Sequence, residues 1–217
     1  MINVVILAAG QGKRMHSRLP KVLQPLAGKP MIEHVLDTVA TLGDVAKTIV
    51  VVGHLAPLVQ ESLKNHPDVQ FVLQEPQLGT GHALQQALPS LDLSAEQTLV
   101  LLGDVPLIQT ETVARLRTVA GDGMALLTTV LRNPTGYGRI LRQKGRIVAI
   151  VEQKDATEGQ KQIREVNTGI MLLPTARLAG WLSELKASNA QGEYYLTDVI
   201  GLAVRDGVRI NLSLIHI

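Results

Sequence analysis

The amino-acid sequence predicts one α/β domain built on a doubly wound, mostly parallel β-sheet with a small antiparallel insertion. The chain has 217 residues, enough for one large hydrophobic core. Hydrophobic residues make up 46% of it but aromatic residues only 2%, so the core must consist of Val, Ile, Leu and Ala, as in buried parallel strands. Short apolar runs alternate with segments of helical periodicity, which is the pattern of βαβ units.

The elements follow from this alternation. The continuous apolar run from Ile2 to Leu7 ends in a glycine-containing loop and is predicted as a buried strand. A helix is predicted from about Met31, because apolar residues recur there at helical spacing until Gly43 stops it. The alternation continues with a strand at 47–52, a helix at 58–65, a strand at 69–73, a helix at 81–88 and a strand at 98–102.

The pattern changes after Leu131, where glycine-rich turns flank short runs at 139–141 and 146–151 and so predict a hairpin. A strand at 166–173 and helices at about 175–187 and 194–204 complete the chain. In a Rossmann-like sheet of this kind, ligands lie beyond the carboxyl ends of the strands. We therefore expect the chemistry just after Leu7, Leu73 and Leu102.

Composition excludes several classes of function. The net charge of +2 comes without a Lys/Arg tract, which argues against a nucleic-acid partner. The chain has no cysteine and no closely spaced pair of histidines, so a zinc site is not expected, whereas a hard cation held by oxygen atoms stays open. No positive charge precedes the first apolar run, and no run approaches the roughly 20 apolar residues that span a bilayer. We expect a cytoplasmic protein without a membrane partner.

The first candidate site is the glycine-containing loop at 7–15. Small residues directly after a buried strand let the backbone approach a ligand, and their N–H groups suit phosphate oxygens. Lys13, Arg14 and Lys21 add positive charge. Met15 stands where a dinucleotide fingerprint needs its third glycine, and the Gly-Lys-Ser/Thr of a P-loop is absent. An ordinary loop with solvated basic residues is the alternative, which the position beyond a strand disfavours.

The second candidate is Asp104, which follows Gly103 directly after the predicted strand at 98–102. One carboxylate facing a phosphate loop suits Mg²⁺, which commonly takes one or two protein carboxylates and fills its octahedron with phosphate oxygens and water. A turn Asp that caps the next segment is the alternative.

The third candidate combines Gln74 with the segment 79–83, Gly-Thr-Gly-His-Ala. Amide and hydroxyl groups can hydrogen-bond the edge of a nucleobase, and the glycines leave room for a planar ring. A helix cap by Thr80 explains part of this pattern equally well, and His82 is interpreted as structural. A fourth group, Gly138, Glu152 and Asn167, is scattered, and each member alone suggests only a turn or a solvated side chain.

Seven segments together carry a resemblance to a known family. They are Leu7 to Met15, Leu19 to Leu23, Gln77 to Ala83, Gly103 to Leu107, Pro134 to Ile140, Asn167 to Gly169 and Gln191 to Tyr195. From Ile2 to about Ile210 the chain resembles the N-terminal uridylyltransferase half of bacterial bifunctional N-acetylglucosamine-1-phosphate uridylyltransferase/glucosamine-1-phosphate acetyltransferase. Related sugar nucleotidyltransferases share the first loop and the Gly-Asp pair, whereas Gly-Thr-Gly-His-Ala points to this family.

The resemblance implies a role for each candidate. The residues implied for the nucleotide are Leu7, Ala8, Ala9, Gly10, Gln74, Gly79, Thr80 and Gly103. Arg14 and Lys21 are implied as catalytic cations, and Asp104 as the ligand of the cofactor Mg²⁺. The residues implied for the amino sugar are Gly138, Glu152, Asn167, Tyr195 and Thr197. The implied reaction joins UTP and N-acetylglucosamine 1-phosphate, by attack on the α-phosphorus, and releases pyrophosphate.

The sequence departs from this family at its end. We expect a nucleotidyltransferase (pyrophosphorylase) domain at 1–211 and an atypical tail at 212–217, without the C-terminal left-handed β-helix or the second Mg²⁺-binding Asn of the family. Acetyltransferase activity and the family trimer are therefore not expected. Three functions stay open: an active uridylyltransferase, a related enzyme for another nucleotide or sugar, and a fragment that binds nucleotide without turnover.

Overall fold

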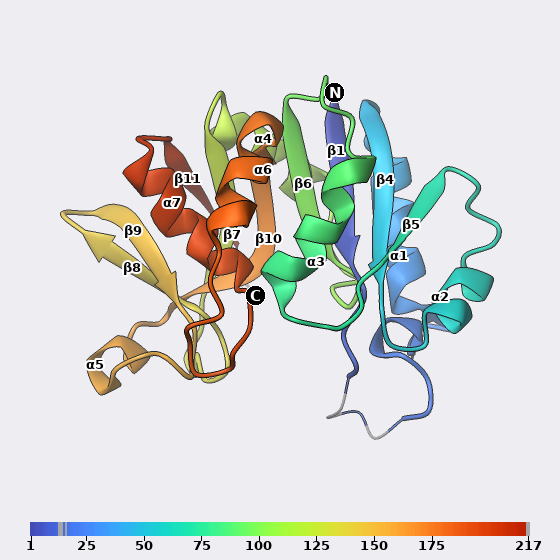
Figure 1. Cartoon of the computed structure of the whole chain (residues 1–217), viewed down its shortest axis with the longest axis horizontal. Helices are drawn as coiled ribbons and strands as arrows, with labels where there is room; N and C mark the ends of the chain where they lie inside the picture. Colours follow the sequence, from blue (N-terminus) through green and yellow to red (C-terminus); the bar gives the residue numbers. More distant parts are fainter. Residues whose placement is uncertain (13–14, 16, 216–217) are drawn as a thin grey trace.

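The computed structural model describes residues 1–12, 15 and 17–215. Its main feature is a nine-stranded sheet with helices on both faces (Figure 1). The elements are β1 (Ile2–Leu7), β2 (Pro25–Leu26), β3 (Lys29–Pro30), α1 (Met31–Ala40), β4 (Val45–Val52), α2 (Ala56–Ser62), β5 (Val69–Leu73), α3 (Thr80–Ala87), β6 (Gln97–Leu102), α4 (Thr110–Ala120), β7 (Met124–Val130), β8 (Arg139–Gln143), β9 (Arg146–Val151), α5 (Glu158–Lys161), β10 (Glu165–Pro174), α6 (Thr175–Glu184), α7 (Val199–Arg205) and β11 (Ile210–Ile215).

The main sheet has the strand order β11-β7-β10-β6-β1-β4-β5. Pairing is parallel between β1 and β4, β1 and β6, β4 and β5, and β7 and β11. β10 runs antiparallel to both β6 and β7, and the hairpin of β8 and β9 joins the sheet through β10. The doubly wound, mostly parallel sheet with a small antiparallel addition confirms the predicted fold class.

Two aliphatic cores lie on opposite faces of the sheet (Figure 1). One contains the buried side chains of α1, α2 and α4, and the other contains those of α3, α6 and α7. The strands contribute Val, Ile and Leu to both cores, as the shortage of aromatic residues requires. Trp181 in α6 is the exception, a large aromatic side chain that is almost fully buried.

The order in which the chain forms its strands predicts a ligand site at one edge of the sheet. From β1 the chain proceeds to β4 and β5, and then returns through α3 to form β6 on the other side of β1. The loops after β1 and β6 therefore leave adjacent strands whose connections run in opposite directions across the sheet. A crevice at the carboxyl ends of such strands is where doubly wound sheets bind ligands.

The helix predicted at 194–204 begins later than expected, with a 3₁₀ turn at Leu196–Asp198 followed by α7. The N–H of Tyr194 donates to the carbonyl oxygen of Leu78 at 2.8 Å, and the N–H of Gly81 donates back to the carbonyl oxygen of Tyr194 at 2.8 Å. This pairing holds the segment extended, so the prediction was wrong at its first residues. The bonds join parts of the chain too distant in sequence for local periodicity to reveal.

Two elements between β6 and the hairpin were not predicted. Helix α4 buries Val113, Leu116 and Ala120, which lie three and four positions apart, and β7 is an almost fully buried run. At the sheet edge, β11 extends through residues 212–215, which the sequence had set apart as a tail. Within the described residues, no helix combines the length and the apolar character needed to cross a membrane.

Trp181 links α6 to α7 and is expected to be a major source of stability. It is 2% exposed, and its indole N–H donates to Asp206 at 2.8 Å. We expect Trp181→Ala to lower the free energy of unfolding by about 3–5 kcal/mol, the usual cost of deleting a buried Trp. Urea unfolding followed by circular dichroism measures this, with Leu93→Ala, at an 81% exposed position, as the control. Equal losses in both variants would contradict the packing argument.

Candidate nucleotide and sugar site

Strand register brings the loops that follow β1 and β6 together, and a further backbone bond brings in the one after β5. Leu7 at the end of β1 is paired with Leu102 at the end of β6. The N–H of Gly103 donates to the carbonyl oxygen of Leu7 at 3.0 Å, and the N–H of Gln74 donates to that of Val52 at 2.7 Å. The positions predicted from strand ends alone thus lie at one edge of the sheet.

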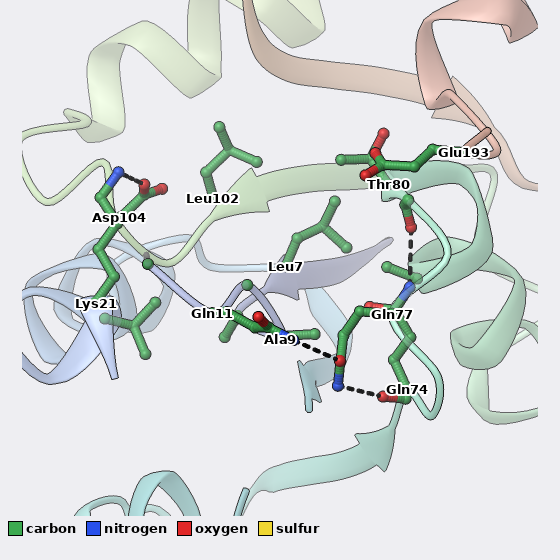
Figure 2. A pocket seen from close by; sticks show the side chains of 16 residues that line it. Leu7, Ala9, Gln11, Lys21, Gln74, Gln77, Thr80, Leu102, Asp104 and Glu193 are labelled. Carbon is green, nitrogen blue, oxygen red and sulfur yellow. Dashed lines mark hydrogen bonds and ion pairs between the residues drawn. The ribbon is translucent and has the colours of Figure 1, made fainter. Parts of the chain in front are cut away.

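A cavity of about 550 Å³ opens at this edge (Figure 2). That volume is in the usual range for small-molecule sites. The lining residues are Leu7, Ala8, Ala9, Gly10, Gln11, Gly12, Lys21, Val22, Gln74, Gln77, Gly79, Thr80, Ala83, Leu102, Asp104 and Glu193. Gly103 lies just beneath, because a Cβ atom there would be 3.0 Å from Val22 and 3.4 Å from Ala8. Arg14, expected at the phosphates, lies outside the described residues.

One end of the cavity carries an ion pair between Lys21 and Asp104 (Figure 2). The Asp104 side chain is 25% exposed, so its carboxylate is within reach of a ligand in the cavity. No group of three or more acidic, His or Cys side chains that could hold a metal occurs in the described part of the chain. A single carboxylate beside a loop that is predicted to bind phosphate nevertheless fits Mg²⁺, which takes its remaining ligands from phosphate and water.

The other end carries side-chain amides from the turn after β5. Gln74 is 3% exposed, and its Nε2 donates to the carbonyl oxygen of Gly79 at 2.9 Å. Gln77 donates to the backbone oxygen of Gln74 and accepts from Gln11 at 3.4 Å, across the cavity rim (Figure 2). Amides arranged in this way offer both donors and acceptors to a planar polar ligand.

Gly79 occupies a conformation that other residues adopt only with strain. Its φ is +108°, and a Cβ atom there would lie 2.6 Å from the carbonyl oxygen of Tyr194. The hydroxyl of Thr80 accepts from the N–H of Leu196 at 3.1 Å and makes no capping bond to α3. The helix-cap interpretation of Thr80 is therefore wrong, because this hydroxyl instead ties the loop to the segment at 193–196.

The residues expected for the sugar also come together. The N–H of Asn167 donates to the carbonyl oxygen of Gly138 at 2.9 Å. A Cβ atom on Gly138 would lie 3.2 Å from Oε1 of Glu152, and that oxygen accepts from the hydroxyl of Thr197 at 2.9 Å. Tyr195 joins more loosely, through a bond from its hydroxyl to Asp155 at 3.2 Å.

Two contacts connect the cavity to the residues expected for the sugar, Gly138, Glu152, Asn167, Tyr195 and Thr197, which we call the sugar group. Gly169, two residues after Asn167, has a φ of +86°, and a Cβ atom on it would lie 2.7 Å from Leu102 in the cavity wall. Only glycine accommodates both the conformation and the approach. The bond from Leu196 to Thr80 makes the second connection, because Leu196 lies between two members of the sugar group.

Comparison with known proteins identifies the family of the chain. Residues 4–175 match the family model of the MobA-like NTP transferase domain. The chain belongs to the MobA-like NTP transferase family. It is 59% identical over 211 residues to the bifunctional protein GlmU of Paraburkholderia phymatum, covering 96% of this chain and 46% of that protein. The corresponding values for GlmU of Bordetella petrii are 57% over 216 residues, 98% and 47%.

The chain thus spans about half the length of the curated relatives it matches, and the predicted resemblance to a half of the bifunctional enzyme is confirmed. In structure, it resembles a Bacillus anthracis protein assigned as a glucose-1-phosphate thymidylyltransferase, with a TM-score of 0.76 and 22% identity. That likeness covers 100% of this chain and 87% of the other. It supports the fold of the NTP transferase family.

Several lining residues of this NTP transferase domain were not singled out from the sequence. Gln11 lies in the predicted loop, and Gln77 lies in a quoted motif, so both had a signal in their position next to recognised residues. Glu193 reaches the cavity because its segment pairs with the turn before α3. Glu193 also lies in a quoted motif, Gln191 to Tyr195, but only the tertiary contact shows that it lines the cavity.

Glu152 is the perturbed carboxyl of the sugar group. Burial raises its pKa above 4.5, and the hydrogen bond from Thr197 opposes this rise, whereas the negative charges of Asp198 and Asp155 add to it. Between the unfolded pKa and the higher folded pKa, the folded state binds more protons than the unfolded state. The folded state therefore loses stability as pH rises through this window. At neutral pH, the ionised carboxylate of Glu152 therefore lowers the free energy of unfolding of the domain.

We expect Glu152→Gln to be more stable than the wild type above this pH window, and the gain to vanish below pH 4.5, where the carboxyl is protonated in both states. The same change should weaken binding of a sugar phosphate by roughly tenfold, because a charged acceptor is lost. Melting temperatures across pH and calorimetric titration measure both effects. Glu111→Gln, at an exposed position in α4, is the control. A variant that is less stable at high pH would contradict the sign.

Proposed function

We propose that this domain transfers a uridylyl group from UTP to N-acetylglucosamine 1-phosphate and releases pyrophosphate. The observation that supports this most directly is the contact of Gly169 with Leu102, which joins the sugar group to the cavity wall. Two substrates bound on either side of that contact would meet at the carboxyl ends of β1 and β6. Membership of the NTP transferase family supports the nucleotide half of the proposal.

At the nucleotide end, the backbone of residues 7–10 would approach the phosphates, because its small side chains leave the N–H groups accessible. Lys21 would neutralise phosphate charge, and Arg14 would do so for the leaving pyrophosphate. Gln74 and Gly79 would hold the uracil ring through its polar edge. These roles agree with the positions of the described residues in the cavity lining.

Asp104 would hold Mg²⁺ in this reaction. The ion, when bound, would supply charge stabilisation at the reacting phosphates. In the described structure the Asp104 carboxylate pairs with the ammonium group of Lys21. The same carboxylate would bind Mg²⁺ in place of Lys21 when the ion is present. Release of Lys21 from this pair would free its ammonium group for phosphate oxygens.

At the sugar end, Glu152 would accept hydrogen bonds from the hydroxyl or amide groups of the hexosamine. Thr197 would orient that carboxylate, since it already donates to Oε1. Asn167 and Gly138 are linked backbone to backbone and would support the ring from the opposite strand. Tyr195 would close the group from the side of α7.

The chemistry requires no nucleophile from the protein. An oxygen of the sugar 1-phosphate is already an anion, and it would form a new bond to the α-phosphorus of UTP while the bond from that phosphorus to the bridging oxygen breaks. The electron pair leaves with pyrophosphate. The domain would contribute alignment of the two substrates and stabilisation of the developing charge.

The test is sugar-dependent release of pyrophosphate. The purified chain is incubated with UTP, N-acetylglucosamine 1-phosphate and Mg²⁺, with a control lacking the sugar. Parallel reactions with other nucleoside triphosphates, and with glucose or glucosamine 1-phosphate, determine specificity. Release that depends on N-acetylglucosamine 1-phosphate and UTP supports the proposal. A preference for another pair indicates a related specificity, and binding of UTP without release indicates a nucleotide-binding domain without turnover.

A further inference from the structure

The orientation of the Gln74 amide follows from the chemistry around it. Its Nε2 lies 2.9 Å from the carbonyl oxygen of Gly79 and 3.1 Å from Nδ1 of His82. A carbonyl oxygen can only accept, so the group of Gln74 that faces Gly79 must be the NH₂ group. The amide of Gln74 is thus not free to exchange its oxygen and nitrogen without losing this bond.

The second hydrogen of the same NH₂ group faces His82. Nδ1 of His82 must then accept, and a neutral imidazole that accepts at Nδ1 carries its proton at Nε2. Nε2 of Gln86, one turn further along α3, lies 3.1 Å from Nε2 of His82. Because two donors cannot pair, this tautomer requires the Gln86 amide to be turned by 180°, so that its oxygen accepts from the N–H of His82. Burial lowers the pKa of His82, which favours the neutral ring that this arrangement needs.

The oxygen of the Gln74 amide is left for a ligand. Oε1 accepts no hydrogen bond from the described residues. It is also not among the polar side-chain atoms of these residues that are both inaccessible to solvent and without a hydrogen-bond partner. Gln74 as a whole is 3% exposed and lines the cavity. Its two N–H groups are occupied, so the cavity meets an obligatory acceptor at this point.

We propose that His82 is a positioning residue for base selection, because it holds the Gln74 amide with its oxygen toward the nucleobase. This rests on the proposed function and deepens it. Uracil presents an N–H donor at N3, which pairs with an amide oxygen. Cytosine presents a lone pair at N3, which the same oxygen repels. Selection of a uridine over a cytidine nucleotide would thus depend on a side chain behind the one that touches the base.

The competing explanation is that His82 only packs. Its ring lies against Tyr194, with centroids 6.4 Å apart and planes tilted by 35°. Loss of packing would weaken binding of every nucleotide in the same proportion, because it would loosen the whole turn. Loss of positioning would change the ratio of affinities, since only the choice between donor and acceptor is affected.

The experiment compares His82→Asn with His82→Leu. An Asn side chain places its oxygen near the position of Nδ1 and keeps an acceptor for Gln74, whereas Leu removes it. Calorimetric titration in Mg²⁺ gives the Kd for UTP and for CTP. We expect the preference for UTP to fall by roughly tenfold in His82→Leu, the order of one hydrogen bond, and to stay within about twofold of the wild type in His82→Asn. An unchanged ratio in His82→Leu would overturn the proposal.

A second measurement does not depend on binding. Long-range ¹H–¹⁵N correlation spectra of the wild type report the tautomer of each histidine, and the spectrum of His82→Asn assigns the signal of His82. A proton on Nε2 is expected, and a proton on Nδ1 would refute the link to Gln74. If the wild type bound neither nucleotide, the proposed function would fail, while the tautomer would still decide the link.

Discussion

Asp104→Asn is expected to lower the turnover of uridylyl transfer by about a thousandfold or more, the scale of losing a group that organises transition-state charge. The substitution keeps the shape of the side chain and removes its charge. The Asp104 carboxylate pairs with Lys21 at the end of the cavity where the proposed function puts the phosphates. An amide would hold neither a divalent cation nor the ammonium group with comparable strength.

Steady-state assays of pyrophosphate release measure this effect, and thermal unfolding shows whether the variant is folded. Asp122→Asn is the matched control, because Asp122 is 84% exposed and pairs with Arg209 at 3.5 Å in a turn remote from the carboxyl ends of β1 and β6. We expect the control to keep the activity of the wild type. If Asp104→Asn retained more than about a tenth of that activity, Asp104 would have no essential role in charge organisation.

Gly79→Ala is expected to lower the free energy of unfolding by about 2–5 kcal/mol and to remove measurable UTP binding. Strain at a positive φ and overpacking both contribute to this loss of stability. The new methyl group would lie 2.6 Å from the carbonyl oxygen of Tyr194, which is backbone and cannot rotate away. The turn before α3 must then separate from the segment at 193–196.

Urea unfolding and calorimetric titration with UTP measure the two consequences. Gly180→Ala is the control, since Gly180 is exposed within α6 and a Cβ atom there would meet nothing within 4 Å. The control should gain about 0.5–1 kcal/mol of stability, the difference between Gly and Ala inside a helix. A Gly79→Ala protein that binds UTP like the wild type would show that the turn tolerates displacement.

Local sequence signals were sufficient for the parallel half of the sheet. β1 and β5 have the bounds expected from their apolar runs. β1 is buried along almost its whole length, whereas β5 lies at the sheet edge and is only partly buried. The rule that ligands lie beyond strand ends then identified Gly10, Gln74 and Asp104 without any contact information. This part of the site is predictable because each residue directly follows, or lies close after, a strand.

The sugar side could not be predicted in this way. Glu152, Asn167 and Thr197 come from three different stretches of the chain. They meet through the antiparallel pairing of β8 with β9 and β10 and through the segment before α7. No periodicity in the sequence records such a meeting, and only resemblance to a family suggested it. Likewise, the extended conformation of Tyr194 depends on its bonds to Leu78 and Gly81, which override local helical preference.

The pairing of residue 194 with the turn at 78–81 also bears on synthesis at the ribosome. A nascent chain that has emerged only as far as β7 possesses the strands that flank the phosphate loop, yet it lacks the segment that braces the opposite wall of the cavity. Tight capture of nucleotide must therefore wait until nearly the whole domain has left the exit tunnel. Under the proposed function, binding energy from UTP would then favour the finished domain over its unfinished precursors.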